Sequence, residues 1–335
     1  MSSNKRNLIF RFLVIITASV FLFFICSSCA SPKPSQLPSV DKSGLRVYYI
    51  DVMQGDCIFI VLPNGNNFMI DLGNGTDRAN ENILKVLREE KVSKIDNLII
   101  SHPDQDHIGG AFKVLNGIEV TSVYAPHILD FTLFPKYKSV VDFLNGKGVN
   151  FNISDSYKII KGEDYALAFL TPTPINQMDS AYLDLLSNTS PTSKQINNLS
   201  PIIYFEYSGV RFLFTGDAEI EQEELLLSNY YSHVYKNTFS VFGVNVVLEE
   251  IDFLKVSHHG SNDASGKEFL DLLKPNNAMI SVDGDNIYGF PNSSVLKRIQ
   301  NANPTCTFWR TDVYGTMVVN VMDNGFYKTL TQLDG

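Results

Sequence analysis

Four side chains that can bind a metal ion lie within one short segment, His102-Pro103-Asp104-Gln105-Asp106-His107. The segment follows an apolar stretch, 97–101, that has the pattern of a buried strand, and a helix is expected to open at 108–110. Loops at the carboxyl ends of strands are where α/β folds place their ligands. Two imidazoles and two carboxylates so close together predict a compact nitrogen and oxygen shell for one or two divalent ions. The alternative is a polar loop at a strand end.

The elements that must position this segment alternate along the chain between strand-like and helix-like patterns. Strands are expected at 45–52, 57–62, 68–71, 97–101, 121–125, 165–171, 202–207, 211–215, 253–257, 277–282, 307–309 and 316–321. Helices are expected at 81–89, 108–115, 140–145, 219–227, 267–273 and 294–301. Two polar stretches, 176–198 and 228–250, look like loops or insertions, and the second is a lid or partner surface if it is functional. This alternation predicts one mixed α/β domain.

The motifs and their order resemble those of the metallo-β-lactamase superfamily. Segment 102–107 resembles the HxHxDH signature, in the version typical of the extracellular hydrolase domain of ComEC-type competence proteins and their stand-alone relatives. The other matching landmarks are YIDVMQGD (49–56), FMIDLG (68–73), FLFTGD (212–217), LKVSHHGS (254–261) and NIYGFP (286–291). The resemblance covers nearly all of 45–321 and implies the α/β fold of this superfamily, a four-layer αββα sandwich with mixed sheets.

The resemblance also implies a site for two divalent ions, zinc or manganese. The six expected metal ligands are His102 and Asp104 on one ion, Asp106, His107 and His258 on the other, and Asp217 between the two. Asp217 is the expected bridge because a carboxylate can offer one oxygen to each ion. Asp106 and Asp217 are therefore the expected catalytic residues.

Further residues are expected next to these ligands. Asp71 is expected to accept an N–H from a ligand histidine and so to fix its tautomer. Gln54 and Asp56 are expected at the rim of the same site. His259 competes with His258, and because adjacent side chains diverge, only one of the two is expected to be a ligand, with His258 favoured.

The chain departs from the superfamily pattern around the first ion. The region that usually carries a third-motif histidine reads Asn197-Asn198-Leu199-Ser200-Pro201, so Asn197 is expected at the rim and the first ion lacks a ligand. His127 either fills this gap or is a surface or rim histidine. Phe290 stands where the related motif has a histidine, which removes a polar group from the edge of the site.

Residues 1–28 are expected to be a lipoprotein signal peptide. Basic residues precede a 14-residue apolar run, 12–25, which is shorter than the roughly 20 residues that a spanning helix needs. The small residues before Cys29 resemble a bacterial lipobox and predict that Cys29 carries a lipid. A Pro/Ser-rich tether, 29–42, and the hydrolase domain, 43–335, are expected to follow, outside the cytoplasm and anchored to a bacterial membrane. The alternative is an ordinary cleaved signal peptide.

The net charge bears on the substrate. The whole chain has a formal net charge of −9, and loss of residues 1–28, which hold three basic and no acidic residues, would leave −12. Such a chain lacks the basic face that gives proteins most of their affinity for nucleic acid, so charge does not support a nucleic-acid partner. The expected function is hydrolysis of phosphodiester bonds, as a nuclease or a cell-envelope phosphodiesterase, by a hydroxide held between two metal ions. The alternatives are hydrolysis of a carboxylic ester, thioester or lactam, and a non-catalytic envelope-binding lipoprotein.

Overall fold

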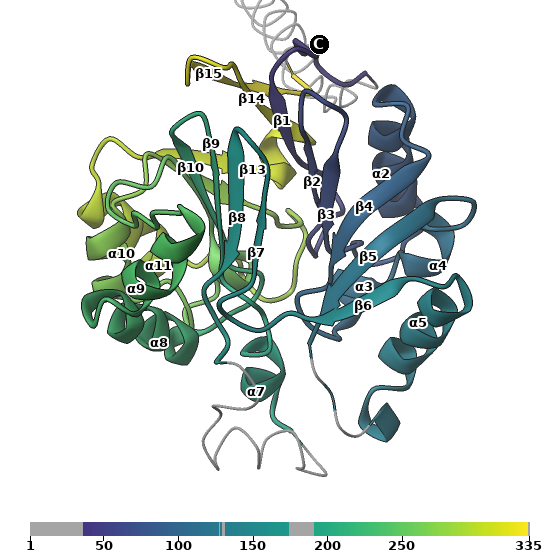
Figure 1. The fold of residues 1–335 in the computed structure, drawn as a ribbon, viewed down its shortest axis with the longest axis horizontal. Helices are drawn as coiled ribbons and strands as arrows, with labels where there is room; N and C mark the ends of the chain where they lie inside the picture. Colours follow the sequence, from purple (N-terminus) through teal and green to yellow (C-terminus); the bar gives the residue numbers. More distant parts are fainter. Residues whose placement is uncertain (1–35, 127, 129–130, 174–190, 334–335) are drawn as a thin grey trace, which may run out of the picture. The chain divides into compact units, whose positions relative to one another are not determined.

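The computed structural model describes residues 36–126, 128, 131–173 and 191–333 (Figure 1). The expected signal peptide, the lipid-bearing Cys29 and the rim histidine His127 therefore lie outside the described residues. The compact unit begins at Gln36. Within the stretch expected to be a tether, Leu37 and Val40 already pack against the hydrophobic core. No helix in the described part of the chain is both long and apolar enough to cross a membrane.

Two mixed sheets form the centre of the domain. The first has the order β15 (Tyr327–Thr331), β14 (Met317–Val321), β1 (Leu45–Tyr49), β2 (Ile58–Val61), β3 (Asn67–Ile70), β4 (Lys94–Ile99), β5 (Glu119–Ala125) and β6 (Asn150–Ile153). The second has the order β13 (Thr307–Arg310), β12 (Asn277–Ile280), β11 (Phe253–Lys255), β10 (Val210–Phe214), β9 (Ile203–Tyr207), β8 (Tyr165–Phe169) and β7 (Ile159–Lys161). Strands β3 to β6 are parallel to one another, as are β10 to β13.

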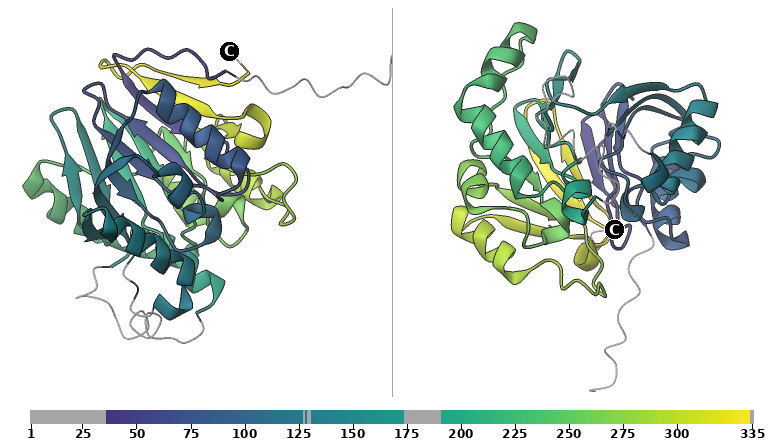
Figure 2. Two further views of the ribbon diagram at one scale, coloured as in Figure 1. Left: turned by 90° about the vertical axis from the view of Figure 1, so that its right-hand side faces the viewer. Right: turned by 90° about the horizontal axis from the view of Figure 1, so that it is seen from below.

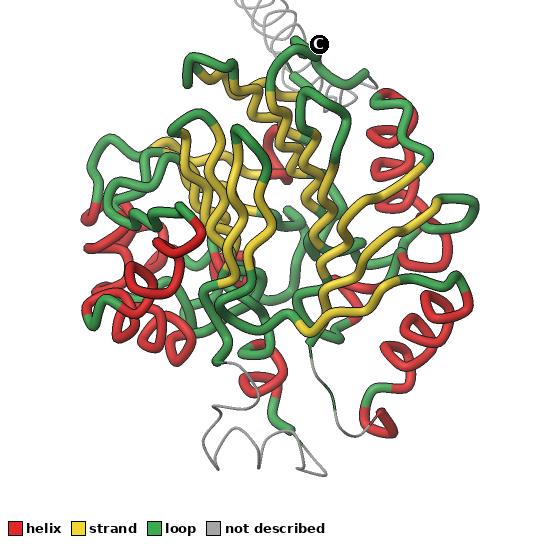
Figure 3. Tube along the Cα trace, in the orientation of Figure 1, coloured by secondary structure: helices red, strands yellow, loops and turns green. Residues whose placement is uncertain are grey.

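Helices cover the outer face of each sheet (Figures 2 and 3). On the first sheet lie α2 (Asp77–Glu89), α3 (Gln105–Ile108), α4 (Ala111–Val114) and α5 (Pro135–Gly146), and on the second lie α8 (Ile220–Tyr231), α9 (Val234–Phe239), α10 (Lys267–Leu273) and α11 (Ser293–Ala302). Two further short helices are α7 (Ser193–Asn197) and α12 (Thr311–Tyr314). This arrangement confirms the four-layer αββα sandwich.

Alternating apolar residues explain the four layers. In β1, Val47 and Tyr49 face the core between the two sheets, whereas Tyr48 faces the core under the first set of helices. In β10, Phe212 packs between the sheets and Leu213 packs under the second set of helices. Because successive side chains of a strand point to opposite faces, a strand that is apolar at every position must be covered on both sides.

Three strands were not expected from the sequence: β6, β7 and β15. Each lies at an edge of its sheet. Their side chains are mostly half-buried or exposed, so they lack the apolar pattern that marks the central strands.

The helix expected at 108–115 is instead two short helices, α3 and α4, separated by Gly109 and Gly110. The backbone passes very close to the end of β3 at this point. A Cβ on Gly110 would lie 2.2 Å from the carbonyl oxygen of Leu72, and one on Gly109 would lie 2.3 Å from that of Asn74. The two glycines thus allow the ligand-rich segment to sit directly against the neighbouring strand end.

The stretch 228–250 is part of the packed domain. It contains the end of α8, the whole of α9 and a chain segment that returns to the second sheet. Its side chains Tyr235, Phe239 and Leu248 are buried in the core beneath the second sheet's helices. Packing therefore explains Tyr235 and Phe239, whereas Tyr231 and Phe242 of the same stretch are exposed.

Candidate metal centre

The ligand-rich segment leaves β4 and turns directly into α3. Asp104 is the N-cap residue of α3, and Asp106 and His107 follow within its single turn. The side chains of His102 and His107 are fully buried, with ring centroids 4.1 Å apart. The carbonyl oxygen of His107 accepts a hydrogen bond from the backbone N–H of Leu72 at 2.7 Å, which ties this turn to the end of β3.

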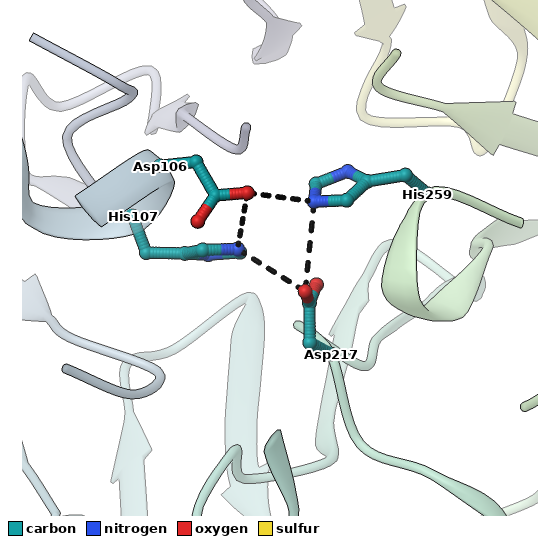
Figure 4. Close-up of side chains that lie close together, drawn as sticks. All are labelled: Asp106, His107, Asp217 and His259. Atoms are coloured by element: carbon teal, nitrogen blue, oxygen red, sulfur yellow. Dashed lines mark ion pairs between the residues drawn. The ribbon is translucent and has the colours of Figure 1, made fainter. Parts of the chain in front are cut away.

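Four side chains from both sheets meet at one point (Figure 4). These are Asp106, His107, Asp217 and His259, whose donor atoms all lie within 4.8 Å of one another. Asp217 Oδ2 is 3.4 Å from His107 Nε2 and 3.5 Å from His259 Nε2. Asp106 Oδ2 is 3.4 Å from His259 Nε2. Two imidazole nitrogens and two carboxylates around a common centre are a donor set that can hold a metal ion.

Contacts at Nδ1 orient the rings of His107 and His259. His107 Nδ1 lies 2.8 Å from Oδ2 of the buried Asp71, which also accepts a hydrogen bond from the Ser101 hydroxyl at 2.6 Å. His259 Nδ1 lies 2.8 Å from the carbonyl oxygen of Ser281, an acceptor that requires the ring proton on Nδ1. Each ring therefore turns Nε2 toward the centre, as histidine ligands of metals do.

Unpartnered buried atoms show that the site fits a cation. Nε2 of His102, His107 and His259 and Oδ1 of Asp217 are buried among the described residues without a hydrogen-bond partner. Buried polar atoms are almost always hydrogen-bonded, and the unpartnered Nε2 atoms of His107 and His259 both face Asp217 Oδ2, which is the arrangement that a bound cation would satisfy. The residues present thus fit a divalent ion.

His102 and Asp104 lie beside this centre. His102 Nε2 is 3.7 Å from Asp104 Oδ2. The other ring nitrogen of His102 is 3.0 Å from the Ser101 hydroxyl and 3.2 Å from the Ser200 hydroxyl. Ser200 belongs to the segment that replaces the third-motif histidine, so that segment supports His102 by a hydroxyl contact.

The two histidines of the pair 258–259 diverge, as the sequence predicts. The geometry favours His259 for the central position, whereas the expected ligand was His258. Both residues have positive φ, and this turn sends His259 inward, with 1% of its side chain exposed, while His258 stays 21% exposed. His258 Nε2 lies 3.9 Å from Asp217 Oδ2, and its Nδ1 lies 3.5 Å from Glu219 Oε1. His258 therefore faces Asp217 from the outer side of the centre.

The expected rim residues have separate surroundings. Asn197 is buried, donates a hydrogen bond to Glu219 Oε1 at 2.8 Å and lies 3.5 Å from His258 Nδ1. Gln54 lines the same pocket as Asp217. Asp56 lies deeper, with 1% exposure, and its Oδ1 is 3.7 Å from His259 Nδ1.

Lys255 is a site residue that the sequence analysis missed. Its side chain is fully buried at the end of β11, where Nζ forms an ion pair with Asp56 and donates a hydrogen bond to the carbonyl oxygen of Gly216 at 3.0 Å. The same Nζ is 3.9 Å from Asp217 Oδ1. The available signal was a lysine within the apolar run Phe253–Val256, because lysines are almost never fully buried without a partner.

Burial and mutual charge shift the pKa values in this cluster in opposite directions. Burial lowers the pKa of His102 to about 3, and the neighbouring His107 adds to the effect. Burial also disfavours a charged His107, but the surrounding carboxylates, led by Asp217, raise its pKa well above the usual range. Burial opposes the charge of Asp217, yet His259 and His107 hold its pKa well below the usual range. Protons and cations thus compete for the same atoms.

A pocket of about 310 Å³ opens onto the centre. Its lining includes the metal-facing residues Asp106, Asp217 and His259 together with Asp104, His258, Gln54, Ser193, Asn197, Ser261, Asp263, Tyr288 and Phe290. A small molecule can therefore reach the carboxylates and the outer histidine from solvent.

The architecture and this centre define a class of protein. Residues 50–175 match the family model described as the metallo-beta-lactamase superfamily. Over these residues the chain is similar to this superfamily, whose members are hydrolases. One solved structure of similar fold is CmlA, a diiron β-hydroxylase from Streptomyces venezuelae, with 14% identity, a TM-score of 0.47, and coverage of 88% of this chain and 55% of that chain.

The chain is also similar, over most of its own length, to competence proteins. It is 28% identical over 295 residues to ComE operon protein 3 of Bacillus subtilis, covering 84% of this chain and 33% of that protein. It is 24% identical over 287 residues to competence protein ComA of Neisseria gonorrhoeae, covering 86% of this chain and 33% of that protein. The chain thus spans about a third of the length of these relatives.

Proposed function

We propose that this chain hydrolyses phosphodiester bonds with two divalent ions, zinc or manganese, bound at the centre described above. The observation that carries the proposal is the convergence of Asp106, His107, Asp217 and His259 with unpartnered Nε2 atoms. Divalent ions, when bound, supply activation of water near neutral pH and positive charge for the oxygens of the reacting group. His102 and Asp104, with Asp217 shared, are the residues that would hold a second ion.

The surrounding residues fix this donor set. Asp71 and the Ser281 carbonyl hold the two histidine rings in the orientation that presents Nε2. Lys255 holds Asp56 and the Gly216 carbonyl, and so sets the position of the turn that carries Asp217. Rigid support of this kind keeps ligands within the narrow tolerance that catalysis requires.

A phosphodiester is the substrate class favoured by the donor set. Carboxylates contribute half of the central cluster, which gives it the hard character suited to ions that bind phosphoryl oxygens. The acidity of the chain favours a small phosphodiester over a long polyanion. Other esters, thioesters and lactams remain the alternative substrates.

We further propose that the enzyme acts outside the cytoplasm, held to a bacterial membrane by a lipid on Cys29. Support comes from the sequence alone, in the 14-residue apolar run and the small residues before Cys29. The packed domain begins shortly afterwards, at Gln36. A lipid so close to the domain would keep the enzyme near the membrane surface.

The test of the proposed activity uses the purified full-length chain, loaded with zinc or manganese, and bis-p-nitrophenyl phosphate. Asp217→Asn keeps the shape of the side chain and removes its charge, and we expect turnover to fall by about 100-fold or more. Asp142→Asn, at an exposed carboxylate paired with Lys138, is the matched control and should leave turnover unchanged. Circular dichroism checks folding. Wild-type turnover in Asp217→Asn would refute the shared-carboxylate site, and an inactive loaded wild type would point to another ester class.

A further inference from the structure

We propose that Tyr288 and Phe290 form a stacking subsite for the planar base of a small, nucleoside-bearing phosphodiester. The subsite lies in the pocket that opens onto the metal centre. This inference rests on the proposed function and adds to it the part of the substrate next to the reacting phosphate.

The rings of Phe290 and Tyr288 form a row of aromatic contacts that begins at His258, beside the metal centre. The rings of Phe290 and His258 meet edge to face, with centroids 5.6 Å apart and an interplanar angle of 66°. Tyr288 stacks on Phe290, with centroids 5.5 Å apart and an interplanar angle of 19°. Phe290 is half-buried, whereas Tyr288 is 62% exposed although it is a large aromatic residue. The outer ring is therefore accessible to a ligand in the pocket.

The loop that carries the two rings is held in place before any ligand binds. The Asn286 side chain accepts hydrogen bonds from the backbone N–H groups of Tyr288 and Phe290 at 3.1 and 3.0 Å, and donates one to the Phe290 carbonyl at 2.8 Å. The loop also packs on the turn that carries the two histidines, because a Cβ on Gly260 would lie 2.6 Å from Pro291 Cβ. A rigid aromatic platform loses little conformational entropy when a ring stacks on it.

The charge of the pocket restricts what can stack there. Among the described residues, the lining contains the carboxylates Asp104, Asp106, Asp217 and Asp263 and no lysine or arginine. An extended polyanion would need basic residues along its backbone, so the pocket suits a ligand with a single phosphodiester at the metal centre. Its volume of about 310 Å³ is at the small end of ligand pockets and matches a compact ligand of this kind.

The geometry favours a planar ring over a cationic headgroup. Recognition of a quaternary ammonium uses several aromatic faces around the cation. Tyr288 and Phe290 are nearly parallel, so together they present one outer face and not a cage. Bases stack well on a single aromatic face, and they do so with little dependence on base identity.

The experiment compares two esters with the same leaving group, thymidine 5′-p-nitrophenyl phosphate and methyl p-nitrophenyl phosphate, on the metal-loaded full chain. We expect wild type to prefer the thymidine ester by about 10-fold in kcat/KM, which corresponds to one stacked base. In Tyr288→Ala this preference should largely disappear through a higher KM for the thymidine ester, with the methyl ester unaffected. Phe290→Ala should act in the same direction. Ile287→Ala, on the same loop but 91% exposed and outside the pocket lining, is the control and should retain the preference.

An unchanged preference in Tyr288→Ala and Phe290→Ala would overturn the subsite. A preference for p-nitrophenylphosphorylcholine that is lost in the same variants would also overturn it, in favour of a cation site. If wild type hydrolyses neither ester, the proposed function fails, and calorimetry then decides the subsite separately. The subsite is supported if wild type binds thymidine 5′-monophosphate more tightly than methyl phosphate and Tyr288→Ala loses this difference. Equal binding of the two compounds by wild type overturns it.

Discussion

Replacement of Lys255 by methionine should destabilise the domain strongly. Methionine has nearly the same length and shape but no charge. In the native protein Nζ is fully buried against Asp56, whose side chain is only 2% exposed, and it also donates to the Gly216 carbonyl. The variant leaves the Asp56 carboxylate buried, and the remaining ring nitrogens near it are Nδ1 of His259 and of His107, at 3.7 and 4.0 Å.

The size of the effect follows from the asymmetry of buried ion pairs. Removal of one partner leaves an uncompensated buried charge and costs about 3–5 kcal/mol of the free energy of unfolding. For a domain of this size each kcal/mol corresponds to roughly 2 °C, so the melting temperature should fall by roughly 6–10 °C. Asp56→Asn combined with Lys255→Met removes both charges and should recover a large part of this loss, which gives a coupling energy of about 2 kcal/mol or more.

The assay is urea unfolding of the metal-free chain in chelator, followed by the fluorescence of Trp309 and by circular dichroism. Lys267→Met is the matched control, because Lys267 pairs with Asp271 on the surface and is 72% exposed. Surface pairs contribute little, so this control should unfold like wild type. If Lys255→Met also unfolds like wild type, or if the double variant is as unstable as the sum of the single variants, the ion pair does not stabilise the site.

Three further predictions follow from the same structure. Burial raises the pKa of Glu223 to about 7, so the native state holds its proton more tightly than the unfolded chain does. Stability should then fall as the pH rises from about 4.5 through 7, by roughly 3 kcal/mol at about 1.4 kcal/mol per pKa unit. In the presence of chelator, Glu223→Gln should remove this dependence of the unfolding free energy on pH. Parallel curves of unfolding free energy against pH for wild type and the variant would contradict the prediction. His259→Ala should weaken zinc binding in competition with a chelator by more than 10-fold, and more than His258→Ala does, whereas the reverse order would restore the assignment from sequence. Cys29→Ala should move the protein from the membrane fraction to the soluble fraction of fractionated cells, and unchanged membrane association would exclude the lipid anchor.

Much of the fold was predictable because its central strands are buried on both faces. The stretches around β1, β2 and β10 are apolar at nearly every position, and this is a strong signal in a single sequence. The edge strands β6, β7 and β15 give no such signal because most of their side chains are only partly buried or exposed. The break between α3 and α4 was also missed, since it depends on how closely Gly110 approaches Leu72 and not on local helix preference.

The sequence by itself determined which chemistry the chain carries. The spacing of His102 to His107, and the positions of Asp217 and of the histidine pair after strand-like runs, already indicated a divalent-metal centre. Such motifs can be recognised in a single sequence because each ligand directly follows the strand that positions it.

Only the tertiary structure decided how these groups face one another. It turned His259 inward against Asp106 and Asp217, left His258 on the outer side, and paired Lys255 with Asp56. It also brought Tyr288 and Phe290 into the pocket. The physical reason is that these relations join the ends of β4, β10, β11 and β12, which come from two different sheets. The direction of a side chain there depends on backbone angles such as the positive φ of His258 and His259, and on packing between segments more than a hundred residues apart.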